Sequence, residues 1–141
     1  MNTESNVKQA LPFFWVHDMN RSLRFYVDGL GFKMTRQWVH EDKLRWCSLK
    51  LGDAALMLQE FWNEGTDKNI PTGELGVGVS IYFECRDALS LYREFRARGV
   101  DAKRPFVGNG LWNSSVTDPD GYHLSFGSPT DEAEETEFVD A

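Results

Sequence analysis

The chain has 141 residues, of which 41% are hydrophobic, 26% charged and 13% aromatic, which suits one modest domain or two small modules sharing a core. The net charge of −7 comes from residues 130–141, which hold six acids and no base; the rest is nearly neutral, which excludes a basic nucleic-acid footprint. The polar first residues and the absence of a long apolar run predict neither a signal peptide nor a membrane span, and the isolated Cys47 and Cys85 favour reduced thiols in a cytoplasmic protein.

The first half of the chain predicts a strand, a helix and three further strands. Apolar and β-branched runs mark the strands, while a polar cap and a closing glycine mark the ends of the helix. In chain order we expect a strand over 12–16, a helix that begins at Asp18 or Asn20 and ends at Gly31, a strand from 32 to 38, and a hairpin of 43–51 and 54–60 around Gly52-Asp53.

The same order returns in the second half. We expect a strand over 77–85, a helix from Asp87 to Gly99, an extended segment over 100–105, and a hairpin of 111–117 and 122–126 around 118–121. Helix ends and hairpin turns of the two halves share one offset, which indicates a duplicated βαβββ module.

These elements predict an α+β fold, in which two βαβββ modules form a curved, cup-shaped mixed sheet with helices on its outer face. The acidic C-terminal segment lacks the apolar content of a packed element, so we expect it to be disordered. The predicted parts are an N-terminal extension over 1–10, modules over 11–62 and 77–128, a linker over 63–76, and a tail over 129–141.

Two motifs resemble one known family. They are Val16-His17-Asp18-Met19-Asn20-Arg21-Ser22-Leu23-Arg24-Phe25-Tyr26, which runs into Gly29-Leu30-Gly31-Phe32, and Asp118-Pro119-Asp120-Gly121-Tyr122-His123-Leu124-Ser125-Phe126. With this spacing the chain, over residues 11–128, resembles the vicinal oxygen chelate superfamily of glyoxalases, ring-cleaving dioxygenases and bleomycin-resistance proteins. The resemblance is specific for the fold and weak for the function, because the fold hosts several chemistries. It implies a homodimer with cups at or near the interface.

The resemblance also assigns the positions where metalloenzymes of this superfamily place their ligands. Here those positions hold Leu11, Met57, Ser80 and Ser125. An aliphatic side chain binds no metal, a thioether is a poor ligand for Zn²⁺, Ni²⁺ or Fe²⁺, and neutral hydroxyls are weak ligands. Shifting one strand would bring Gln59 or Glu60 to the Met57 position and leave the other three unchanged. We therefore expect no metal and no other cofactor.

Alternation along the strands indicates which side chains line the cup. The expected lining suits a planar or cationic small molecule, held by stacking and a few hydrogen bonds. Trp112 follows a glycine-rich loop and is expected to close over a ligand. Core packing is the alternative for the aromatic residues, and a partly exposed strand start is the alternative for His123. The expected ligand-binding residues are Phe13, Trp15, Trp46, Met57, Gln59, Ser80, Tyr82, Trp112, His123 and Ser125.

The favoured function is metal-independent binding or sequestration of a small aromatic or cationic molecule, similar to bleomycin resistance, without catalytic residues. The alternative is a glyoxalase- or dioxygenase-type lyase or oxidoreductase with a divalent metal on non-standard residues. An acid–base enzyme using Glu84 or His123, and a non-catalytic interaction module, are further hypotheses, although no nucleophile and base stand at a recognisable spacing. The expected partners are a small-molecule ligand and a second copy of the chain, with neither nucleic acid nor membrane.

Overall fold

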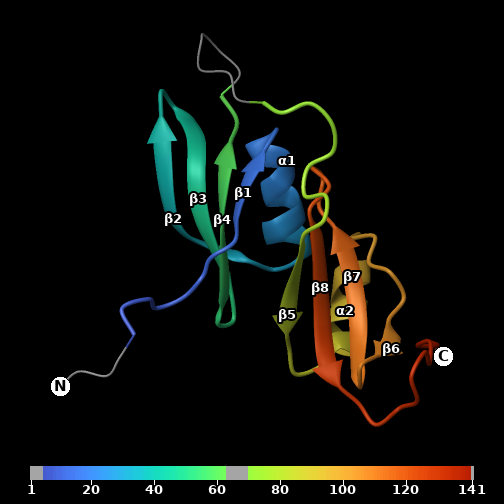
Figure 1. Cartoon of the computed structure of the whole chain (residues 1–141). Helices are drawn as coiled ribbons and strands as arrows, with labels where there is room; N and C mark the ends of the chain where they lie inside the picture. The colour runs from blue at the N-terminus through green and yellow to red at the C-terminus, as the bar shows by residue number, and fades with distance from the viewer. Residues whose placement is uncertain (1–4, 63–69, 141) are drawn as a thin grey trace.

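The computed structural model describes residues 5–62 and 70–140, which form two modules of four strands and one helical layer each (Figure 1). Module 1 consists of β1 (Phe13–Val16), α1 (Met19–Leu23), the π-helical turn η1 (Arg24–Gly29), β2 (Lys33–His40), β3 (Lys43–Leu51) and β4 (Ala54–Glu60). Module 2 consists of β5 (Ser80–Glu84), α2 (Ala88–Ala97), β6 (Phe106–Gly108), β7 (Leu111–Thr117) and β8 (His123–Pro129). The predicted α+β class with two βαβββ modules is confirmed.

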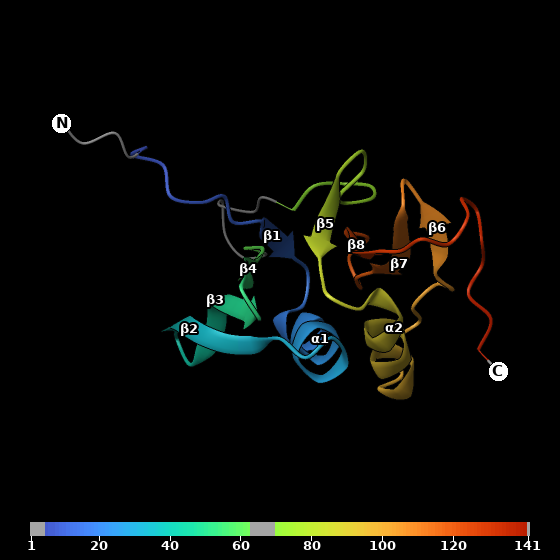
Figure 2. The same cartoon turned by 90° about the horizontal axis from the view of Figure 1, so that it is seen from below.

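Hydrogen bonding divides the eight strands into two four-stranded mixed sheets. The orders are β1-β4-β3-β2 and β5-β8-β7-β6. The pairs β1–β4 and β5–β8 are parallel, and the other neighbouring strands are antiparallel. Figure 2 shows both helices side by side on the same side of the two sheets. Each sheet therefore has a helix-covered face and an open face.

The helix boundaries follow the capping residues that the sequence indicates. The carboxylate of Asp18 accepts a hydrogen bond from the backbone N–H of Arg21 at the start of α1, and Asp87 accepts one from Ser90 at the start of α2. Gly31 and Gly99 follow the helices with φ of +93° and +87°, a conformation that glycine adopts without steric cost. The two glycines keep the offset of 68 residues that indicated the duplication, whereas the two capping aspartates are 69 residues apart.

A single hydrophobic core lies between the helices and the sheets and extends through both modules. Along β3 and β4 buried and partly exposed residues alternate, so every second side chain points toward the helix. Phe83 stacks on Phe126 with ring centroids 4.8 Å apart and meets Phe32 of module 1 edge-on at 6.3 Å. The modules thus share one core rather than forming two independent domains.

The turn Asp118–Gly121 joins module 2 to the helix of module 1. Asp118 is buried and accepts a hydrogen bond from the Tyr26 hydroxyl at 2.8 Å. The Asp120 side chain is fully buried and accepts from Arg21 at 3.0 Å and from the backbone N–H of His17 at 3.2 Å. We call this segment the inter-module turn.

The C-terminal segment differs from the predicted disordered tail. Its backbone pairs with the β6 region, and Phe138 meets the rings of Tyr92 and Trp112 edge-on. The Glu134 carboxylate accepts hydrogen bonds from the backbone N–H groups of Asn109 and Gly110. The prediction of disorder rested on the acidic composition and did not take account of Phe138 and Glu134, which together hold the segment on module 2.

The two ends of the chain differ in their surroundings. Residues 5–10 are exposed and lead away from the body of the molecule (Figure 1). Part of the expected linker, 63–69, and the first four residues lie outside the described residues. Among the helices described, none has the length and apolar content needed to cross a membrane.

Candidate functional site

The open face of module 1 carries three rows of side chains across its strands. Residues directly opposite each other on neighbouring strands share a face, so the register defines each row. The rows are Trp15–Gln59–Trp46–Trp38, Phe13–Met57–Ser48–Arg36, and Ala55–Lys50–Lys33. The structure thus brings five predicted ligand-binding residues together on one surface: Phe13, Trp15, Trp46, Met57 and Gln59.

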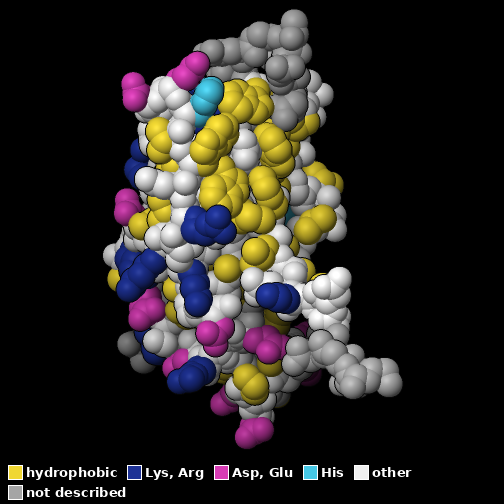
Figure 3. Space-filling model, turned by 90° about the vertical axis from the view of Figure 1, so that its left-hand side faces the viewer, with side chains coloured by type: hydrophobic (Ala, Val, Ile, Leu, Met, Phe, Trp, Pro, Cys, Tyr) yellow, Lys and Arg dark blue, Asp and Glu magenta, His cyan; other side chains and the backbone are white. Residues whose placement is uncertain are grey.

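The aromatic rings at the β1 edge of this face are close to one another. Phe13 and Trp15 are stacked with centroids 5.8 Å apart, and Trp15 is stacked on Phe61 at 5.7 Å. Phe13 is 42% exposed, so a ring of this group is available to solvent. Figure 3 views the molecule from the β2 side and shows hydrophobic side chains gathered over one half, bordered by Lys and Arg.

A second aromatic group, which the sequence reasoning missed, lies at one end of the same face. Trp38 is stacked with His40 at 5.4 Å, and Trp62 meets both rings edge-on. The guanidinium of Arg45 lies 3.9 Å from the centroid of Trp62. The predicted strand ended at Trp38 and left out His40, whereas β2 extends to His40 and places the two rings on one face, because residues two apart share a face.

The open face of module 2 combines polar groups with two exposed aromatic rings, those of Tyr82 and Phe106. Ser80 lies opposite His123, and Tyr82 lies opposite Ser125. The Ser125 hydroxyl is hydrogen-bonded to a serine of β7, and Nδ1 of His123 lies 3.2 Å from a threonine hydroxyl of β7. These four predicted residues share one face, which offers hydrogen-bonding groups beside the exposed rings of Tyr82 and Phe106.

The ring of Tyr82 lies across Gly127. A methyl group added at Gly127 would come within 2.7 Å of Cζ of the Tyr82 ring, so glycine is needed for this close approach. Burial raises the pKa of Tyr82, and the nearby Glu84 and Cys85 add to that increase. The phenol is therefore protonated at neutral pH and can donate a hydrogen bond.

Trp112 does not share either open face. On β7 it alternates with Asn113 and lies on the same side as the buried Ser114 and Val116, which face α2. Its ring meets Phe138 edge-on, with centroids 6.0 Å apart. The expectation that Trp112 closes over a ligand treated it as part of a loop, whereas strand parity turns it toward the helix side.

The four positions matched to metal ligands do not provide a donor set for a divalent cation. Met57 and Ser125 lie on the open faces of different modules, the Ser125 hydroxyl is hydrogen-bonded within its sheet, and Leu11 lines a cavity of about 470 Å³. Glu60, the candidate after a register shift, is buried on the helix face, where it binds Arg45 and the backbone N–H of Met19. Within the described residues no three His, Cys, Asp or Glu side chains gather as a metal site would require.

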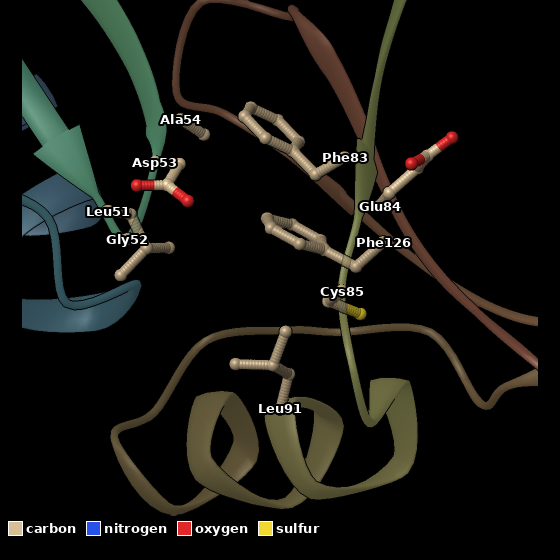
Figure 4. A pocket seen from close by; sticks show the side chains of 9 residues that line it. All are labelled: Leu51, Gly52, Asp53, Ala54, Phe83, Glu84, Cys85, Leu91 and Phe126. Atoms are coloured by element: carbon tan, nitrogen blue, oxygen red, sulfur yellow. The ribbon is translucent and has the colours of Figure 1, made fainter.

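A cavity of about 350 Å³ lies between the modules, away from the predicted binding residues (Figure 4). The β3–β4 turn forms one wall with Asp53 and Ala54, and the rings of Phe83 and Phe126 point toward it from module 2. Its other lining residues are Leu51, Gly52, Glu84, Cys85 and Leu91. Another cavity of about 350 Å³ beside the inter-module turn includes His123.

Comparison with known proteins yields a family and a fold. The family model described as Glyoxalase/Bleomycin resistance protein/Dioxygenase superfamily matches residues 8–126. The chain is 30% identical over 121 residues to the lactoylglutathione lyase of Haemophilus influenzae, covering 79% of this chain and 84% of that one.

Several solved structures share the fold at low sequence identity. SMU.1112c has a TM-score of 0.69 and 21% identity over 88% of this chain and all of its own. A bleomycin-binding protein complexed with bleomycin has a TM-score of 0.65 and 20% identity over 88% of this chain and all of its own. The bleomycin resistance determinant encoded on transposon Tn5 has a TM-score of 0.66 and 22% identity over 87% and 98%.

Proposed function

Because this chain belongs to the Glyoxalase/Bleomycin resistance protein/Dioxygenase superfamily, we propose that it binds a small planar aromatic molecule, without a metal, on the open face of module 1. One observation carries the proposal: Trp15, Trp46 and Phe13 share a sheet face that none of the helical segments in the described residues covers. Exposed apolar patches of this kind mark interaction sites in soluble proteins.

The arrangement provides both stacking and orientation. An aromatic pair contributes about 0.5–1.5 kcal/mol beyond the area it buries, so contact with two of these rings would discriminate planar from aliphatic ligands. Gln59 lies between Trp15 and Trp46 in its row and carries a donor and an acceptor. Met57 in the next row is unbranched and polarisable, which lets it adapt to the ligand's outline.

Calorimetric titration with 2-naphthamide, a neutral planar probe, tests the aromatic site. Trp46→Ala should weaken binding by about tenfold, which is the loss of one ring contact and its buried area. Trp112→Phe is the matched control, because this tryptophan lies on the other side of its sheet, and it should leave the affinity unchanged. Equal loss in both variants, or no binding by the parent protein, would refute the site.

Metal independence is tested separately. Probe binding should be the same in EDTA and in excess Ni²⁺ or Zn²⁺, since Met57, Ser80 and Ser125 offer no strong ligand. Metal content of the protein purified without chelators gives a second measurement. Stoichiometric metal that is lost when an open-face residue is substituted would overturn the metal-free proposal.

A second copy of the chain completes the cup in this proposal. The aromatic residues lie on the open face of module 1, whereas His123 and Ser125 lie on that of module 2, and the two faces belong to separate sheets. A dimer that brings module 2 of one copy opposite module 1 of the other would unite them. Sedimentation equilibrium should show a dimer near 32 kDa, about twice the mass of 16.2 kDa. A monomer at the concentrations where the probe binds would exclude this part.

The similarity to a lactoylglutathione lyase favours one alternative, a lyase acting on lactoylglutathione. This alternative needs a metal or acid–base group that the matched positions do not supply. Direct assay of lactoylglutathione formation and cleavage, with and without Ni²⁺ and Zn²⁺, separates the two functions. If the protein turns over lactoylglutathione and Trp46→Ala abolishes that activity, the open face of module 1 is a catalytic site rather than a site of sequestration.

A further inference from the structure

The open face of module 1 carries cations next to its aromatic rings. Lys33 and Lys50 lie directly opposite each other on β2 and β3, and Arg36 lies opposite Ser48 in the neighbouring row. The Arg36 guanidinium also lies over the Trp46 ring, 5.9 Å from its centroid. We call Lys33, Arg36 and Lys50 the cationic cluster.

None of these three cations forms an ion pair with a residue that the structure describes. The other two cations of β3, Lys43 and Arg45, both bind the carboxylate of Glu60. Like charges directly opposite each other on neighbouring strands destabilise a sheet. The Lys33–Lys50 pair therefore costs folding stability and gains nothing from a described partner.

Among the residues that the structure describes, the acids near this face are in the turns rather than on its strands. Glu41 and Asp42 belong to the β2–β3 turn, beyond Trp38 and His40, and Asp53 belongs to the β3–β4 turn. β2, β3 and β4 contribute no acidic side chain to the open face, because their one acid, Glu60, is buried on the helix side. A shallow cavity of about 250 Å³ lies beside Lys33, Thr35 and Lys50.

We infer that the ligand of this face is an aromatic anion, whose ring stacks beside Trp46 while its acidic group lies at the cationic cluster. The inference rests on the proposed aromatic site and narrows it, since it excludes the cationic ligands that the sequence left open. Charge complementarity carries it: the rings and the unpaired cations lie in adjacent rows of one sheet. A carboxylate or sulfonate on a planar ring system has both required parts.

A matched series of naphthyl probes tests the inference by calorimetry. 2-Naphthoate should bind about tenfold more tightly than neutral 2-naphthamide, because three partly exposed ionic contacts each add a small amount. 2-Naphthylmethylammonium should bind more weakly than the amide. The preference for the anion should shrink as salt rises from 0.05 to about 0.5 M, since exposed charges are screened.

Substitutions then locate the preference. Arg36→Gln combined with Lys50→Gln should reduce the advantage of 2-naphthoate over the amide to about threefold or less, whereas Lys103→Gln, an exposed lysine of module 2, should leave it unchanged. Lys50→Gln alone should also raise the melting temperature, because it relieves the Lys33–Lys50 repulsion. If Lys50 had a purely structural role, its substitution would not lower the affinity for the anion while raising the stability of the protein.

The possible results are distinct. If the amide binds and the anion binds no better, the inference fails while the aromatic site stands. If the anion is preferred but the double variant keeps the preference, the cationic cluster is excluded as its source. If none of the three probes binds, both the inference and the proposed function fail.

Discussion

Replacing Glu60 with glutamine should lower the stability of the protein by about 3 kcal/mol. The Glu60 carboxylate is buried and accepts hydrogen bonds from Arg45 at 3.1 Å and from the backbone N–H of Met19 at 2.8 Å. It also forms an ion pair with Lys43. Only 6% of the Arg45 side chain is exposed. Glutamine keeps an oxygen for the Met19 bond but removes the charge, so the Arg45 cation is left buried without its counterion.

The magnitude follows from what remains around Arg45. Removing one partner of a buried ion pair costs about 3–5 kcal/mol. Arg45 keeps hydrogen bonds to the carbonyls of Glu60 and Phe61 and its contact with the Trp62 ring, which favours the lower value. Lys43 is half exposed, so its pairing contributes little. For a chain of this size the loss corresponds to a decrease of about 10 °C in melting temperature.

Urea and thermal unfolding of Glu60→Gln and of the control Glu84→Gln measure this effect. Glu84 is an exposed acid of β5 without a described ion pair, so its substitution should change stability by less than about 0.5 kcal/mol. Adding Arg45→Met to Glu60→Gln should recover part of the loss, since it removes the uncompensated cation. A change of under 1 kcal/mol in Glu60→Gln, or no recovery in the double variant, would refute the reasoning.

Three further predictions concern other parts of the molecule. An aromatic disulfide reagent at pH 8 should titrate Cys85 in the folded protein and reach Cys47 only on unfolding, since burial raises the pKa of Cys47 to about 11; two fast thiols would contradict this. Phe138→Ala should expose residues 130–140 to a glutamate-specific protease without changing the melting temperature by more than a few degrees; unchanged cleavage would show that the ring does not hold the segment. Burial raises the pKa of Asp118 above its ordinary value of 3.8, so the folded chain binds the carboxyl proton more tightly than the unfolded chain does. The stability that this proton contributes is therefore lost as pH rises through the pKa of the folded state. Urea unfolding between about pH 4 and 6 should therefore show a flatter pH dependence in Asp118→Asn than in the parent, and parallel curves would count against it.

The fold was predictable from local chemistry. The capping aspartates, the glycines that end both helices, and the alternation along β3 and β4 each specify a conformation within a few residues. For the same reason the open-face positions of Trp15, Met57 and Tyr82 followed from alternation alone. These features need no knowledge of contacts between distant parts of the chain.

The cationic cluster was not predictable in this way. Lys33 and Arg36 are three residues apart, so strict alternation places them on opposite faces of β2. The register shifts between Met34 and Arg36, and the extra residue brings both cations to the open face. A bulge depends on the pairing of two strands, which alternation along one strand does not show.

The C-terminal segment illustrates a different limit. Its composition resembles a solvated chain, yet the contacts of Phe138 with Tyr92 and Trp112 depend on where three distant segments meet. The average composition of the segment does not reveal the effect of a single aromatic residue such as Phe138.

The two hairpin turns of the repeat have taken on different roles. In module 2 the inter-module turn is fixed by the buried side chains of Asp118 and Asp120, which bind the helix of module 1. Its counterpart in module 1, Gly52-Asp53, borders the cavity between the modules. Assembly therefore constrains the acids of one copy of the turn, whereas the other copy is constrained at Gly52, whose φ of +59° favours glycine. In a duplicated protein of this kind, change at Asp53 can alter what the cavity accepts without loosening the joint between the halves.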